Sequence, residues 1–174
     1  MPQSWAAIPD STVRNSSLID SLRRFWRFLL SIFVGADHLP DRVLPEEPVS
    51  RFILDKDQFR QERGFIYPAA FLPSKKTANT SVYRVESLPE TRIWQLAEKF
   101  VTALRADKKP VLARADIKAK TAFHQDLAIQ PDRLPHPRHA NIINWPTDRS
   151  AQKAKALELA KNAKLRVRPE AASS

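Results

Sequence analysis

The sequence has no cysteine and only two glycines in 174 residues. Without cysteine the chain cannot form disulfides, thiolate zinc sites or iron–sulfur clusters, and it has no cysteine nucleophile. Average usage would supply roughly twelve glycines. Gly35 and Gly64 stand alone, so neither a Gly-rich phosphate loop nor a Gly-x-Gly-x-x-Gly turn can form. Nucleotide binding through those loops is therefore excluded, and we predict no bound cofactor and no metal ion.

Acidic side chains are outnumbered: 19 Asp and Glu stand against 29 Lys and Arg, which gives a formal charge of +10. The positive excess is spread over residues 51–174, because residues 1–50 hold slightly more acidic than basic side chains. A basic surface attracts polyanions. The predicted partner is nucleic acid or an acidic protein, with an anionic membrane surface as a further alternative. A solvated basic face that binds nothing is the competing interpretation.

Residues 17–34 have the apolar spacing of an amphipathic helix, and Gly35 stands where such a helix would end. The uncharged run at residues 28–36 is too short to cross a bilayer. Three interpretations stay open: a helix docked on the domain or a partner, a helix at a membrane interface, or a secretory signal. The residues predicted to contact a membrane or partner are Arg23, Arg24, Phe25, Trp26, Arg27 and Phe33.

Three domains follow from the composition. Pro40, Pro45 and Pro48 lie among acidic residues, which predicts a proline-rich acidic linker over 37–50. Residues 1–36 would then be a mobile start and the amphipathic helix, and residues 51–170 a basic domain. The lack of cysteine fits the reducing cytoplasm, which is the predicted location, with membrane association as an alternative.

The basic domain has the pattern of an α+β protein. Residues 81–85 and 111–117 read as strands, rich in β-branched or alternating residues. Between them Ser87 and Glu90 have the spacing of a capping box, followed by an apolar helical stripe to about residue 105. Further strands are predicted over 51–54, 140–145 and 165–168, and a second helix over 148–164. We therefore expect a small mixed sheet with two packed helices, plus the N-terminal amphipathic helix on its linker.

The densest basic cluster lies near the C-terminus, and we predict that it contacts phosphates. Its members are Lys153, Lys161, Lys164, Arg166 and Arg168. The three lysines would share one side of the second helix. This cluster favours a non-enzymatic basic accessory protein that binds nucleic acid or a nucleic-acid-bound partner.

A second cluster combines imidazole, guanidinium and amide groups: His136, Arg138, His139 and Asn141. These side chains donate hydrogen bonds to oxyanions, so a basic anion-binding loop is one interpretation. The other is an ordinary turn in which the imidazoles cap backbone groups. A metal site is disfavoured, because Pro135 and Pro137 prevent a helix and no carboxylate is adjacent.

An enzyme is the alternative function. The tripeptide Tyr83-Arg84-Val85 on a predicted strand is similar to the one that opens the sheet of ADP-ribosyltransferase-like toxins, and only that tripeptide matches. Such catalysis needs Arg84, Arg114 and the histidines to converge with a carboxylate. Adjacent strand residues point to opposite faces, so Tyr83 and Arg84 are not expected to line one cleft.

Three stretches, at residues 81–94, 113–117 and 139–146, also resemble a group of small uncharacterised bacterial proteins. The resembling region covers about two thirds of the chain. This resemblance implies a shared domain, and it supplies neither an activity nor a functional residue to carry over.

Overall fold

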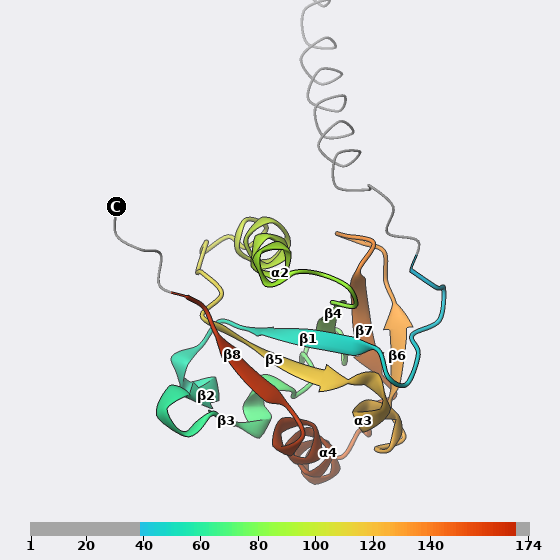
Figure 1. Ribbon diagram of the computed structural model, residues 1–174. Helices are drawn as coiled ribbons and strands as arrows, with labels where there is room; N and C mark the ends of the chain where they lie inside the picture. Colours follow the sequence, from blue (N-terminus) through green and yellow to red (C-terminus); the bar gives the residue numbers. More distant parts are fainter. Residues whose placement is uncertain (1–38, 170–174) are drawn as a thin grey trace, which may run out of the picture. The chain divides into compact units, whose positions relative to one another are not determined.

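The computed structural model describes residues 39–169, and a six-stranded sheet lies at their centre (Figure 1). Along the chain its strands are β1 (Pro48–Ile53), β4 (Thr80–Arg84), β5 (Ala113–Lys118), β6 (Ala128–Pro131), β7 (His139–Ile143) and β8 (Lys164–Val167). Their order across the sheet is β6-β7-β4-β1-β5-β8. A separate ribbon pairs β2 (Phe59–Arg60) with β3 (Phe65–Ile66). The α+β class is therefore confirmed.

The helices are α2 (Glu90–Ala97), its π-helical continuation η4 (Glu98–Thr102), α3 (Ala119–Phe123) and α4 (Arg149–Lys161). Three 3-10 turns are η1 (Lys56–Gln58), η2 (Gln61–Arg63) and η3 (Pro68–Ala70). No helix within residues 39–169 is long and apolar enough to cross a membrane. The amphipathic helix predicted over 17–34, with Arg23, Arg24, Phe25, Trp26, Arg27 and Phe33, lies outside the described residues.

The predicted strand, helix and strand over 81–117 form as β4, α2 and β5, but the two strands are not neighbours. β1 lies between them and pairs with both in antiparallel register. Every hydrogen-bonded pair of the large sheet is antiparallel, so the parallel pairing expected in a mixed sheet does not form. β4 and β5 run in the same direction, because α2 lies between them in the chain and returns it to the other end of the sheet. β1 separates them, so they do not pair with each other.

The start of α2 differs in detail from the prediction. Ser87 has a φ of 59° and does not cap the helix, because the N-cap position is taken by Pro89. Glu90 instead accepts a hydrogen bond from the indole Nε1 of Trp94 one turn later, at 2.8 Å. The predicted apolar stripe is confirmed in α2, where Ile93, Leu96 and Ala97 are buried. The prediction that it continues to about residue 105 is wrong, because the helical segment ends at Thr102 and Leu104 is exposed.

One face of the sheet, here called the α4 face, is mainly apolar, and its polar side chains Arg51 and Thr80 donate hydrogen bonds to the carbonyl oxygens of Ala70 and Phe71. Val49, Val82 and Ile142 from three neighbouring strands are fully buried in a cluster that includes α3, α4 and η3. Alanines on both sides of this interface leave room for the helices to approach the sheet closely: Ala113, Ala115, Ala119, Ala122, Ala140, Ala156 and Ala160. This face holds the larger of the two apolar clusters and is closed by helices.

The opposite face, here called the α2 face, is covered differently. Phe52, Tyr83 and Val111 pack against Ile93 and Trp94 of α2 in a second, smaller cluster. Figure 1 shows α2 on one side of the sheet and α3 and α4 on the other. The strand register places polar side chains beside this cluster on the same face: Ser50, Ser81, Asp116, His139 and Asn141.

A buried ion pair joins the first described residues to the end of β4. Nε of Arg84 donates to Glu47 at 2.5 Å and Nη2 at 2.8 Å, and both side chains are almost completely buried. The same guanidinium donates to the carbonyl oxygen of Pro40 at 2.7 Å, and Val43 is 2% exposed. Residues 39–50 therefore belong to the folded domain, which corrects the prediction of a linker over 37–50.

Replacing Glu47 by Gln tests this pair. The substitution removes the charge that faces a buried guanidinium, so it should lower the free energy of unfolding by about 3–5 kcal/mol, measured by urea denaturation. Glu46 provides the control, because its exposed carboxylate pairs with Lys120 at 2.7 Å on the surface. Glu46→Gln should leave the unfolding midpoint nearly unchanged. Equal effects of the two substitutions would contradict a dominant role for the buried pair.

Candidate nucleic-acid interface

The five basic residues predicted to contact phosphates are divided between α4, β8 and the residue that follows β8. α4 ends at Lys161, so Lys164 lies on β8 and does not extend the helical row of lysines. Lys164 and Arg166 pair in register with Asp116 and Arg114, which places them on the α2 face. Arg168 forms an ion pair with Glu98 of η4. Only Lys153 and Lys161 remain on α4, and Lys161 is paired with Glu158 at 2.7 Å.

The structure instead gathers basic residues around a notch at the start of α4. The notch has a volume of about 290 Å³, and its lining is Pro73, Ser74, Lys75, Ala78, Arg149 and Gln152. None of these six residues is acidic. Lys76 and Lys153 follow two of them in the chain and are exposed. We call Lys75, Lys76, Arg149 and Lys153 the basic notch residues.

Hydrogen bonds within the loop hold one wall of the notch in shape. Ala78 adopts a left-handed φ of 56° and donates its amide to the carbonyl oxygen of Ser74 at 2.8 Å. The amide of Lys76 donates to the Ser74 hydroxyl at 3.2 Å. On the other wall, Nη1 of Arg149 donates to the Gln152 side-chain oxygen at 2.9 Å. The two walls therefore present cations from short, locally fixed segments.

The nearest carboxylate along the chain is the α4 N-cap, Asp148. It accepts hydrogen bonds from the Ser150 hydroxyl and from the Ala151 amide at 2.7 Å. These hydrogen bonds, that of Ser150 above all, lower the pKa of Asp148, so it remains ionised at neutral pH. The carboxylate that precedes Arg149 in the chain is thus occupied in capping α4.

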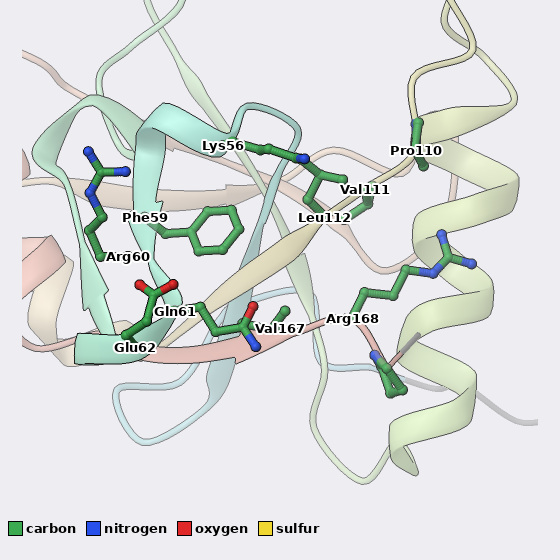
Figure 2. A pocket seen from close by; sticks show the side chains of 11 residues that line it. Lys56, Phe59, Arg60, Gln61, Glu62, Pro110, Val111, Leu112, Val167 and Arg168 are labelled. Carbon is green, nitrogen blue, oxygen red and sulfur yellow. The ribbon is translucent and has the colours of Figure 1, made fainter. Parts of the chain in front are cut away.

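A larger groove lies where the β2–β3 ribbon faces the start of β5 and the end of β8 (Figure 2). It has a volume of about 920 Å³, and Val111, Leu112 and Val167 contribute to its apolar lining. Figure 2 shows the Phe59 ring projecting into the groove, with Lys56 on one side of it and Gln61 and Glu62 on the other. The groove therefore combines an aromatic floor with charges of both signs.

Aromatic rings also gather on the ribbon beside this groove. Phe65 is 43% exposed, and its ring meets Tyr67 edge to face with centroids 5.0 Å apart. The Arg60 guanidinium lies over the Tyr67 ring, 5.7 Å from its centroid. We call Arg60, Phe65 and Tyr67 the ribbon aromatic group. Arg60 and Phe65 were not predicted as binding residues, since only the position of Phe65 next to Gly64 in a charged segment indicates exposure.

The second predicted cluster is not an exposed anion-binding loop. His136, Arg138 and His139 are 4%, 3% and 7% exposed. Nη1 of Arg138 donates to the carbonyl oxygens of Glu86 at 2.9 Å and Arg84 at 3.2 Å. His136 accepts the Arg138 amide through Nδ1 at 3.1 Å. The His136 and Arg138 side chains thus hydrogen-bond to backbone groups, as the turn interpretation predicts.

His139 and Asn141 lie apart from that turn, on β7 and on the α2 face. Nε2 of His139 is 2.7 Å from the Ser81 hydroxyl. Asn141 donates to the carboxylate of Asp132 at 2.9 Å. The predicted cluster is thus divided, and the structure adds Ser81 and Asp132 to one half of it. Sequence spacing did not indicate Ser81, which is 58 residues from His139.

The side chains of the enzyme alternative point in different directions. Tyr83 packs on Phe52 with ring centroids 5.2 Å apart on the α2 face, and burial raises its pKa. Arg84 is bound to Glu47 at the end of the strand. Arg114 donates to Glu90 at 2.6 Å. Tyr83, Arg84 and Arg114 therefore do not converge on one point, as the alternation of strand residues predicts.

A polar network on β1 and β5 completes the α2 face. The Ser50 hydroxyl donates to Asp116 at 2.5 Å, and Nη2 of Arg114 lies 3.3 Å from the same carboxylate. The Arg114 guanidinium also lies over the Trp94 ring, 5.5 Å from its centroid. Burial raises the pKa of Asp116, against the opposing effect of the Ser50 hydrogen bond. This network links the sheet to α2 through charge as well as packing.

No family model matches this chain, and neither does any curated protein or any solved structure. The resemblance to a group of small bacterial proteins therefore stays a prediction. We therefore infer what the protein binds from the side chains on its surface.

The raised pKa of Asp116 predicts how stability depends on pH. The folded-state pKa lies above the unfolded value of 3.8, so the folded chain binds the extra proton first as the pH falls. As the pH falls through the folded-state pKa, the contribution of Asp116 to the free energy of unfolding should therefore increase. The difference in free energy of unfolding between the native chain and Asp116→Asn should therefore shift in favour of the native chain on acidification, measured by urea denaturation. A constant difference would contradict the raised pKa.

Proposed function

We propose that this protein binds nucleic acid through the basic notch residues and acts as an accessory protein in the cytoplasm. The observation that supports the proposal is the notch at the start of α4, where Lys75 and Arg149 line a small depression without a carboxylate among the lining residues. Ser74 and Gln152 add polar groups to the same lining. Guanidinium, ammonium and hydroxyl groups are the donors that proteins use on phosphate oxygens.

The arrangement suits a phosphate backbone better than a base edge. Four cations from two separate segments can contact successive phosphates, and each neutralised phosphate releases condensed counterions. Such contacts supply affinity without reading sequence. We therefore expect binding that depends steeply on salt and weakly on sequence.

Neutral substitutions at the notch test this binding. Lys75→Gln combined with Arg149→Gln removes two phosphate contacts, so the slope of log K against log salt should become shallower by about 1.4–1.8. The measurement is fluorescence anisotropy of a labelled oligonucleotide at several salt concentrations. Lys161→Gln provides the control on the same helix, because that ammonium is already paired with Glu158. An unchanged slope in the double variant would refute the notch as the interface.

The ribbon aromatic group extends the proposal to unpaired bases. An exposed ring beside an arginine is a stacking surface for a base, and such stacking contributes about 1–3 kcal/mol per base. Phe65 is the exposed member, and Arg60, which pairs with Phe65 in the strand register, supplies a cation over the Tyr67 ring. A single strand can present its bases to these rings, whereas a duplex keeps its bases stacked inside. We therefore propose a preference for single strands.

Phe65→Ser should weaken binding of a single-stranded oligonucleotide by roughly 5-fold to 160-fold, the equivalent of one lost stacking contact. Binding of a duplex of equal length should change little. Leu134→Ser serves as the control, because Leu134 is an exposed apolar residue outside the ribbon, at 77% exposure. Equal losses for single strand and duplex would exclude a stacking role for Phe65.

A further inference from the structure

Ser81, His139 and Asp132 form a chain of hydroxyl, imidazole and acceptor oxygens on the α2 face. Ser81 lies on β4, His139 on β7, and Asp132 directly follows β6. The Ser81 hydroxyl is 2.7 Å from Nε2 of His139. On the other side of the ring, Nδ1 lies 3.0 Å from the carbonyl oxygen of Asp132 and 3.4 Å from its carboxylate. Three separate strands or strand ends thus bring these groups together.

The partners of the ring assign its proton. A carbonyl oxygen can only accept, so Nδ1 of the neutral imidazole carries the hydrogen. Nε2 then holds the lone pair and accepts the hydrogen of the Ser81 hydroxyl. A hydroxyl that donates to an imidazole, with the far nitrogen held by oxygen acceptors, is the arrangement in which the imidazole acts as a general base.

The surroundings restrain the imidazole ring, and Ser81 is not fully buried. The His139 ring meets Tyr83 edge to face, with centroids 5.3 Å apart, which restrains its orientation. The His139 side chain is 10% exposed and Ser81 is partly exposed. Asn141 lies opposite Ser81 in the strand register and donates one Nδ2 hydrogen to Asp132. Its second Nδ2 hydrogen is a candidate donor to a developing oxyanion.

We propose that Ser81 is a nucleophile activated by His139, and that this site cleaves a small ester by acyl transfer. Asp132 is a positioning residue that holds the ring. The inference goes beyond nucleic-acid binding, does not depend on it, and departs from the prediction of a non-enzymatic protein.

The reaction balances with water as the second substrate. Oγ of Ser81 bonds to the ester carbonyl carbon while its proton passes to Nε2 of His139. The bond from that carbon to the alkoxy oxygen then breaks, and the departing alcohol takes the proton from Nε2. Water next gives a proton to Nε2 and bonds to the acyl carbon. The bond to Oγ breaks, the acid leaves, and the proton returns to Ser81.

A fluorophosphonate probe on the full-length protein tests the nucleophile. In that reaction Oγ bonds to phosphorus, fluoride departs and the hydroxyl proton passes to His139. We expect label on Ser81, located by peptide mass spectrometry, and no label in Ser81→Ala. His139→Gln should slow labelling by about 10²-fold to 10⁴-fold, the usual contribution of a general base. Ser87→Ala is the matched control, an exposed serine on the β4–α2 connection, and should label like the native chain.

Asp132→Ala tests whether Asp132 positions the His139 ring or instead helps to bind the probe. It should lower the maximal labelling rate while the probe concentration that gives half the maximal rate stays the same, at an unchanged thermal midpoint. Absence of label on Ser81 in the folded native chain would overturn the proposal.

The lack of cysteine allows a second test that needs no ester to fit the site. Ser81→Cys and Ser87→Cys each create a single thiol, and iodoacetamide measures how much of it is thiolate. Cys at position 81 should react at least tenfold faster than Cys at the more exposed position 87, because His139 takes its proton. Adding His139→Gln should abolish the difference. Equal rates in the two single variants would overturn the role of His139 as a base.

Discussion

The buried ion pair between Arg84 and Glu47 is the contact on which the arrangement of the strands depends. A guanidinium in the interior is costly unless a carboxylate and further acceptors surround it. Glu47 and the carbonyl oxygen of Pro40 supply them, which holds residues 39–47 against the end of β4. The chain therefore enters β1 between β4 and β5, and α2 must cross over a strand that lies between the two it connects. The antiparallel pairing of β1 with both β4 and β5 follows from this insertion.

The two faces of the sheet then take different roles. The α4 face is closed by apolar packing with small residues at the helix contacts, and it holds the larger of the two apolar clusters. The α2 face carries hydroxyl, imidazole and carboxyl groups next to a smaller cluster. Each polar group there needs a partner because it is partly or wholly buried, and the partners are other side chains of the same face. This requirement brings Ser50 to Asp116 and Ser81 to His139.

Local patterns predicted much of the fold. The apolar stripe over Ile93 and Leu96 predicted α2, and the run rich in alanine and lysine after residue 148 predicted α4. Lys153, which the sequence predicts to contact phosphates, follows the notch residue Gln152 in the chain. Lys75 and Arg149 were not singled out, because 74 residues separate them in the chain. The helical row with Lys164 failed because the helix ends three residues earlier.

The sequence by itself determined which chemistries are excluded, roughly where α2, α4 and most strands of the large sheet lie, and that the chain is basic. Only the tertiary structure decided that β1 separates β4 from β5, that His136 and Arg138 serve the backbone, and that Ser81 meets His139. Periodicity reports which side of an element faces the interior, since burial of apolar surface acts on each element locally. Periodicity does not show which other helix or strand packs against that side. That choice rests on contacts such as Arg84 with Glu47, between residues far apart in the chain, whose energies exist only once the strands are paired.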